Sequence, residues 1–139
     1  MNQPILPGST LGVLGSGQLG RMFAIAARRL GYYVHVYSPE RDSPTGQVAD
    51  VEYAASYDDS EQLTRFAQGV DVVTFEFENV PARITNLIGG LTRIRPSGQV
   101  LNISQHRIRE KTTLRNAGFP VPEFREVLNA DGLDAALKV

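Results

Sequence analysis

Hydrophobic residues along this chain follow two spacings, which alternate from the N-terminus to about residue 118. Short runs of apolar and β-branched residues, which are typical of buried strands, occupy residues 10–14, 33–37, 51–55, 72–77 and 93–95. Between these runs, apolar positions recur three and four residues apart, as they do on one face of a helix. Strands and helices in alternation predict an α/β fold, in which helices cover both faces of a parallel sheet.

The first two predicted helices carry apolar stripes that we expect to face the sheet. The first stripe comprises Leu19, Met22, Phe23, Ala26 and Leu30, and the second comprises Leu63, Phe66, Ala67 and Val70. Gly31 follows the first helix at the position of a C-terminal cap. Asp58 and Glu61 match a capping box, which predicts that the second helix begins at Asp58.

Two further helices are marked by their ends. Pro81 suits the start of a third helix, which Gly89–Gly90 would terminate. A longer helix is predicted over residues 104–116, and Gly118 stands where it should stop.

The last part of the chain resembles the opening of another unit. Residues 119–122, Phe-Pro-Val-Pro, are stiff and extended, which suits a connector between domains. Residues 124–128 are expected to form a strand, and a helix is expected to start at Asp131. Because one strand and one helix cannot bury a core, we expect one domain over residues 1–118 and an incomplete second domain over residues 119–139.

Composition excludes several classes of protein. With 42% hydrophobic and 21% charged residues, the 139-residue chain is expected to fold around a packed core. A net charge of -1 gives no general attraction to nucleic acid or membranes. The absence of cysteine excludes disulfides and thiolate metal sites. No apolar run approaches the roughly 18 residues of a membrane span, and the N-terminus lacks a secretory signal, so we expect a cytoplasmic protein.

A glycine-rich loop lies between the first strand and the first helix. Gly15, Gly17 and Gly20 follow the pattern G-x-G-x-x-G, in which the glycines allow a tight turn, the close approach of a ligand and packing of the helix on the strand. The free N–H groups at the start of the following helix favour an anion. The pattern therefore predicts a phosphate-binding loop.

The sequence after the second strand argues against a dinucleotide as the ligand. An NAD site places an acidic residue at the end of that strand, but the strand ends in Tyr37–Ser38 and Glu40 comes two residues later. Ser38 and Arg41 would suit the 2′-phosphate of NADP, which leaves a weaker dinucleotide alternative open.

Two carboxylates occupy the end of the strand over residues 72–77. Phe75 and Phe77 share one face of this strand, and Glu76 and Glu78 share the other. Open α/β sheets bind ligands at the carboxyl ends of their strands, so Glu76 is a candidate acceptor for a ligand amine or hydroxyl. The alternative is that Glu78 and Asn79 only begin a loop and cap the next helix.

A basic segment follows in the predicted fourth helix. Arg107 and Lys111 lie four residues apart and therefore share a helix face, where an anion such as an ATP phosphate would relieve their repulsion. The alternative is a solvated basic face. The sequence contains no recognisable nucleophile–base set and no metal-ligand spacing, so no catalytic residue and no metal site are predicted.

Three motifs taken in order resemble one enzyme family. They are G-S-G-Q-L-G-R-M, F-E-F-E-N-V-P and Q-H-R-I-R-E-K, and together they resemble the N5-carboxyaminoimidazole ribonucleotide synthases of the ATP-grasp superfamily. The resemblance extends from about Ser9 to Val139. It implies a Rossmann-like pre-ATP-grasp domain that binds substrate, followed by the start of an ATP-grasp lobe. It also implies a ligase of de novo purine biosynthesis, which converts 5-aminoimidazole ribonucleotide, bicarbonate and ATP to the N5-carboxylated ribonucleotide, ADP and phosphate.

The resemblance implies roles for individual residues. Gln18 and Leu19 match positions that hold the ribonucleotide, and Glu76 matches a strand-end carboxylate that faces it. Arg107 matches an arginine that contacts ATP, and Lys111 matches a lysine to which no role can be assigned. The glycine loop would then serve the ribose phosphate of a mononucleotide. We therefore expect the amides that open the first helix and the carboxylate of Glu76 to meet at one pocket.

The resemblance also implies Mg²⁺ on the ATP phosphates and a homodimer. The strand lysine, glycine-rich flap and acidic magnesium ligands of the later lobes do not occur in this sequence, and Lys138 is too early to be that lysine. We therefore expect the N-terminal part of a longer enzyme, inactive alone. His106 departs from the family, which often has aspartate beside the arginine.

Three alternatives stay open. An ATP-dependent glycinamide ribonucleotide formyltransferase shares the glycine turn, but it typically has glutamate at the position of Gln18 and lacks F-E-F-E-N. A nucleotide-sensing Rossmann module would bind NAD or ATP without catalysis. A purely structural domain would bind no ligand.

Overall fold

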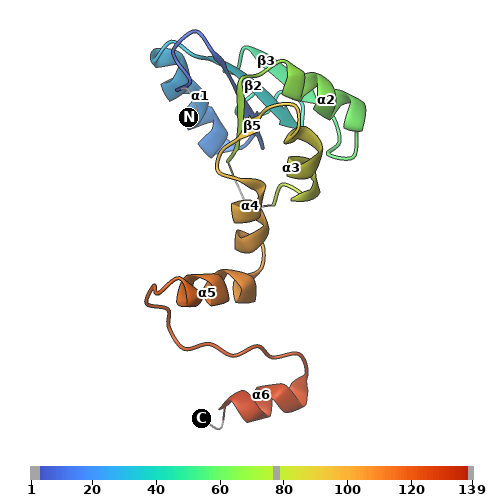
Figure 1. Ribbon diagram of the computed structural model, residues 1–139. Helices are drawn as coiled ribbons and strands as arrows, with labels where there is room; N and C mark the ends of the chain where they lie inside the picture. Colours follow the sequence, from blue (N-terminus) through green and yellow to red (C-terminus); the bar gives the residue numbers. More distant parts are fainter. Residues whose placement is uncertain (1–3, 77–78, 138–139) are drawn as a thin grey trace. The chain divides into compact units, whose positions relative to one another are not determined.

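The computed structural model of the chain describes residues 4–76 and 79–137, and Figure 1 labels their helices and strands. The chain forms two compact units, Met1–Asn102 and Ile103–Val139, which are described separately below.

The first unit contains a five-stranded parallel sheet with the strand order β3-β2-β1-β4-β5. Its strands are β1 (Thr10–Leu14), β2 (Tyr33–Ser38), β3 (Val51–Ala54), β4 (Val72–Phe75) and β5 (Arg93–Ile94). The chain proceeds from β1 to β2 and β3 on one side of β1, and later returns to place β4 and β5 on the other side. This reversal creates a switch point at the carboxyl ends of β1 and β4, where open α/β sheets bind their ligands.

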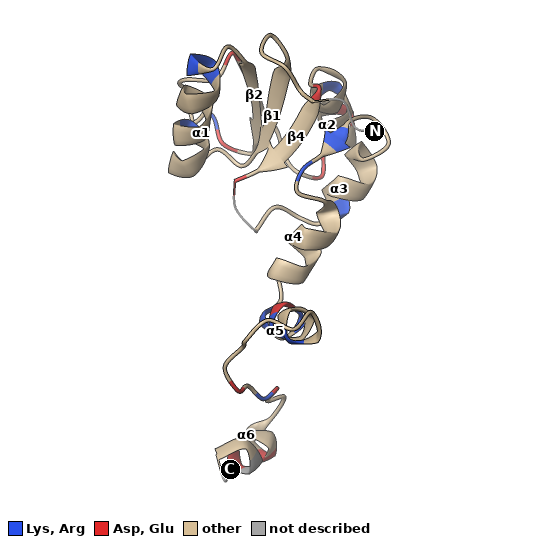
Figure 2. Cartoon of the chain, turned by 60° about the vertical axis from the view of Figure 1, so that its left-hand side comes forward, with Lys and Arg blue, Asp and Glu red and all other residues tan. Residues whose placement is uncertain are grey.

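Helices cover both faces of this sheet, which confirms the predicted α/β fold (Figure 2). They are α1 (Gln18–Arg29) on one face and α2 (Ser60–Gln68) and α3 (Arg83–Ile88) on the other, while α4 (Gly98–Ser104) follows β5. On one face Ala24 and Ala27 of α1 pack with Val13 and Val34. The other face buries a larger cluster, in which α2 and α3 pack on alternate strand residues such as Leu14, Tyr37 and Val73.

The predicted orientation of α1 is wrong. The helix buries Gly20, Ala24 and Ala27, whereas the predicted stripe is turned outward, with Leu19 and Met22 63% and 60% exposed. Small residues let the helix axis approach the sheet closely, and this close contact decides which face is buried. By contrast, the stripe predicted for α2 is buried as expected.

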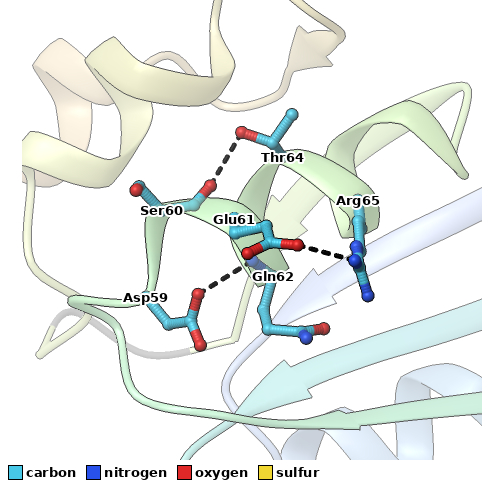
Figure 3. A network of polar contacts seen from close by, with 6 residues as sticks. All are labelled: Asp59, Ser60, Glu61, Gln62, Thr64 and Arg65. Atoms are coloured by element: carbon cyan, nitrogen blue, oxygen red, sulfur yellow. Dashed lines mark hydrogen bonds and ion pairs between the residues drawn. The ribbon is translucent and has the colours of Figure 1, made fainter.

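The capping residue of α2 is also one position later than predicted. The helix begins at Ser60, and the side chain of Asp59 accepts a hydrogen bond from the N–H of Gln62 (3.0 Å). Asp58 instead forms an ion pair with Arg83 of α3. Figure 3 shows the cap, together with the Glu61–Arg65 pair and the hydroxyl of Thr64 donating to the carbonyl of Ser60.

Several other boundaries differ from the predictions. The described part of β4 ends at Phe75, while Phe77 and Glu78 lie outside the described residues. The helix expected from Pro81 begins at Arg83. The helix expected over residues 104–116 forms as α5 (Arg107–Asn116), so it begins three residues later than expected and ends where predicted. A separate helix that was not predicted, α4, precedes it and ends at Ser104.

The second unit holds α5 and α6 (Ala130–Leu137). Gly118 has a φ of 82° and follows α5, which confirms the predicted stop. The strand expected over residues 124–128 does not form. A strand needs a neighbour to hydrogen-bond with, and the described part of this unit offers none. No residue described after Leu101 is buried.

None of the described helices is long and apolar enough to cross a membrane.

Candidate functional site

A cavity of about 480 Å³ opens at the carboxyl ends of β1, β2 and β4, and we call it the strand-end cavity. It is lined by Gly15, Ser16, Gly17, Ser38, Pro39, Glu40, Tyr57 and Glu76. Four segments that are far apart in sequence therefore meet at the switch point of the sheet.

The carboxylate of Glu76 lies on the amides that open α1. The N–H of Gly17 donates to Oε1 (3.0 Å), and the N–H of Gly20 donates to Oε2 (3.3 Å). A Cβ atom at position 17 would lie 3.0 Å from Oε1, so a glycine there leaves room for the carboxylate. A negative charge at a helix N-terminus is stabilised by the free N–H groups and the helix dipole. The structure thus brings together Glu76 and the glycine loop, as the sequence indicated.

The loop between β2 and β3 also holds the glycine turn, through two hydrogen bonds from Thr45. Thr45 donates its N–H to the carbonyl of Ser16 (3.0 Å) and its hydroxyl to the carbonyl of Gly17 (2.9 Å). A Cβ atom at Gly20 would come within 2.4 Å of the Thr45 hydroxyl oxygen, so only glycine fits there without displacement. The sequence pattern did not single out Thr45, because contacts across 28 positions leave no local signal.

Glu40 supplies a second carboxylate to the strand-end cavity. The hydroxyl of Ser16 donates to Oε2 of Glu40 (3.3 Å), and the N–H of Glu40 donates to the hydroxyl oxygen of Ser38 (3.2 Å). In the sequence this glutamate stands too late to serve as the ribose ligand of an NAD site. In the structure the turn after β2 nevertheless brings it to the cavity.

Tyr57 is a further cavity residue that the sequence did not reveal. Burial raises the pKa of its phenol to about 12; the carboxylates of Glu76 and Glu40 act in the same direction, while the N–H of Gly15 opposes them. The hydroxyl donates to the carbonyl of Tyr37 (3.4 Å). The phenol therefore stays protonated and neutral in any ordinary buffer.

The other predicted substrate residues lie beside the cavity rather than in its lining. Gln18 and Leu19 form the first turn of α1, directly after Gly17, and both side chains are exposed. Their predicted contact with the ribonucleotide stays a prediction.

The basic segment belongs to the second unit. Arg107 pairs with Glu110 (2.5 Å), and the ammonium of Lys111 lies 5.5 Å from the centre of the Phe124 ring. His106 caps α5, since its Nδ1 accepts from the N–H of Arg109 (3.4 Å). The imidazole thus serves as the N-terminal cap of α5, a role for which aspartate is also suited. The predicted ATP contact of Arg107 stays a prediction.

The described residues contain no group of three or more His, Asp or Glu side chains that could hold a metal ion.

Comparisons with known proteins agree on one family. The model of the ribonucleotide synthetase preATP-grasp domain matches residues 9–105. The N5-carboxyaminoimidazole ribonucleotide synthase of Brucella melitensis is 41% identical over 131 residues, which are 94% of this chain and 36% of that protein. This chain thus spans only about a third of such relatives.

Solved structures give the same result. A crystal structure of an N5-carboxyaminoimidazole ribonucleotide synthetase with ADP superposes with a TM-score of 0.93 at 42% identity, covering 99% of this chain and 37% of that one. The synthase of Aspergillus clavatus, in complex with ADP and 5-aminoimidazole ribonucleotide, superposes with a TM-score of 0.78 at 30% identity, covering 94% and 35%. The resemblance inferred from the three motifs is confirmed.

Proposed function

Because the chain belongs to the ribonucleotide synthetase preATP-grasp family, we propose that it is the ribonucleotide-binding part of an N5-carboxyaminoimidazole ribonucleotide synthase. The complete enzyme would carboxylate 5-aminoimidazole ribonucleotide with bicarbonate and ATP, releasing ADP and phosphate. The relatives that carry this name support the proposal over a glycinamide ribonucleotide formyltransferase.

The observation that carries this proposal is the position of Glu76. Its carboxylate is held by the amides of Gly17 and Gly20 at the strand-end cavity. These two hydrogen bonds favour one orientation of the carboxylate, which keeps free lone pairs for a further donor. A ligand hydroxyl or amine that donates to this carboxylate would be oriented without further ordering of the protein.

The neighbouring residues are given supporting roles in the same proposal. Gln18 and Leu19, exposed at the first turn of α1, would contact the ribonucleotide as it enters. Arg107 would contact ATP, in which case its pairing with Glu110 would have to yield to a phosphate. Lys111 is left without a role.

The wider features of the proposal concern the complete enzyme. It would be a cytoplasmic homodimer that binds neither nucleic acid nor membranes. Mg²⁺ would neutralise the ATP phosphates there, but we assign no described residue to it, because none of them forms a suitable cluster. The 139-residue chain alone would not turn over ATP.

Calorimetric titration of the purified chain tests the proposal. We expect binding of 5-aminoimidazole ribonucleotide and at least a tenfold loss of affinity in Glu76→Gln, because a charged acceptor is lost. Glu126→Gln is the matched control, since that side chain is exposed in the second unit. Preferential binding of glycinamide ribonucleotide, NAD or NADP, or release of phosphate from ATP by this chain alone, would contradict the proposal.

A further inference from the structure

The strand-end cavity offers two carboxylates as hydrogen-bond acceptors, whereas several of the donors around it are already engaged. The N–H groups of Gly17 and Gly20 bind Glu76, and the N–H of Gly15 donates to the carbonyl of Tyr37 (3.0 Å). The hydroxyls of Ser16 and Tyr57 donate to Glu40 and to the Tyr37 carbonyl. A phosphate needs several donors, and each of these would have to give up an existing partner.

The charges at the cavity also disfavour a bound phosphate. Glu40 and Glu76 both line it, and its lining contains neither lysine nor arginine. The arginine in the first turn of α1, Arg21, donates instead to the carbonyl of Pro44 and the side chain of Gln47, each at 2.9 Å. A phosphate dianion in this cavity would therefore face two carboxylates without a compensating cation.

Each carboxylate retains free acceptor capacity. A carboxylate has about four lone-pair positions, and the described contacts use two on Glu76 and one on Glu40. The cavity is thus built to receive N–H or O–H donors. In a ribonucleotide such donors are the ribose hydroxyls and the exocyclic amine.

We propose that the strand-end cavity receives the hydroxyl- or amine-bearing part of the ribonucleotide and excludes its phosphate, and that Glu40 is the specificity-determining acceptor beside Glu76. This inference rests on the proposed function and deepens it. It also revises the expectation that the glycine loop binds the ribose phosphate, because the loop amides hold Glu76 in its place.

The test compares whole and partial ligands on the 139-residue chain. The probes are 5-aminoimidazole ribonucleotide, its ribonucleoside, ribose 5-phosphate and inorganic phosphate. Calorimetry gives the affinities, and ¹H–¹⁵N spectra follow the amides of Gly17 and Gly20. Binding of the ribonucleoside but not of ribose 5-phosphate would identify the amine as the main donor, and binding of both would identify the hydroxyls.

The decisive variant is Glu40→Gln, with Glu126→Gln as the control. We expect Glu40→Gln to weaken the ribonucleotide and the ribonucleoside by the same factor, about tenfold or more, because both lose the same charged acceptor. Glu40→Asp keeps the charge and should restore part of the affinity. Inorganic phosphate should leave the two glycine amides unshifted. Unchanged melting temperatures would show that the variants fold.

The opposite results are equally clear. If the cavity held the phosphate, Glu40→Gln would remove a repulsion and tighten the ribonucleotide, and inorganic phosphate would displace Glu76 and shift both amides. Either result, or an unchanged affinity in Glu40→Gln, overturns this inference while leaving the proposed function standing. If the chain binds no ribonucleotide at all, the proposed function fails and this inference fails with it.

Discussion

Helices α2 and α5 illustrate the difference between the two units of the chain. Both have a side-chain cap at the N-terminus, Asp59 for α2 and His106 for α5. Yet α2 buries Leu63, Phe66 and Ala67, whereas α5 buries none of its ten residues. A cap is a local interaction and needs only the neighbouring residues, whereas a buried face needs a partner from elsewhere in the chain.

The second unit relies on contacts between side chains at its surface. The Arg107–Glu110 pair and the stacking of Arg115 on the Phe124 ring, 4.1 Å from its centre, are examples. Such contacts contribute only a few tenths of a kcal/mol to about 1 kcal/mol each. Short helices held in this way are marginal in water, so we expect the two units to respond very differently to equivalent substitutions.

The largest expected effect comes from shortening a phenylalanine in each unit. Phe66 is fully buried and Phe119 is 60% exposed. Phe66→Ala should lower the free energy of unfolding by about 3–5 kcal/mol because it leaves a cavity in the core. Phe119→Ala should change it by about 0.5 kcal/mol or less. Urea unfolding followed by circular dichroism measures both, and equal losses would remove the distinction between the units.

Adding a methyl group to a glycine in each unit should have a smaller effect. Gly20→Ala places a Cβ atom 2.4 Å from the hydroxyl oxygen of Thr45, and we expect a loss of about 1–3 kcal/mol in unfolding free energy. In Gly132→Ala in α6 the added Cβ atom meets two exposed side chains, Asn129 at 3.2 Å and Val127 at 3.9 Å. Alanine favours helix more than glycine does, so this variant should be neutral or slightly stabilising. A neutral Gly20→Ala would mean that Thr45 moves aside freely.

Removal of the two caps sharpens the comparison further. Asp59→Ala should cost about 1 kcal/mol, and it should increase hydrogen exchange throughout α2. His106→Ala should cost about 0.5 kcal/mol or less, because its bond to Arg109 is long, at 3.4 Å. Exchange rates of the α5 amides measure the second effect. Faster exchange in α2 after His106→Ala would show that the units are coupled more strongly than expected.

The smallest effect should appear only in acid. Burial tends to raise the pKa of Glu52, but hydrogen bonds from the hydroxyl and N–H of Ser43 and from the N–H of Asp42 prevail and hold it below 4.5. Because the folded pKa is the lower one, the stabilisation is complete above the unfolded pKa and is lost as the pH falls through the folded value. Thermal unfolding between about pH 6 and pH 3 should therefore show a smaller decline for Glu52→Gln than for the wild type. An identical decline would contradict this assignment.

The fold of the first unit was predictable because its signals are local. The alternation of strands and helices identified the parallel sheet. Gly31, which follows α1, has a φ of 85°, as expected for a glycine at the C-terminal end of a helix. The orientation of α1 was not predictable from its hydrophobic stripe. Its buried residues, Gly20, Ala24 and Ala27, contribute little to hydrophobic periodicity, although small residues spaced three and four apart were a readable sign of close packing.

The candidate site was predictable only in part. Glu76 was identified because it ends a strongly marked strand beside a glycine loop. Glu40, Thr45 and Tyr57 were not, since their roles arise from loops whose course no periodic pattern records. The strand expected over residues 124–128 failed for a related reason, because its composition suits a strand but no partner strand is present among the described residues.

The hydrogen bonds that Glu76 accepts join positions that are 59 and 56 residues apart, and so connect the residue directly after β4 to the start of α1. Under the proposed function, position 76 is under two constraints, because its side chain both stabilises the domain and binds the ligand. An uncharged residue at position 76 that still bound the ribonucleotide would no longer stabilise the N-terminus of α1. A different anionic group that did stabilise α1 would change the shape of the strand-end cavity. Descendants of this protein should therefore vary their glycine loops and their ligand preferences only together.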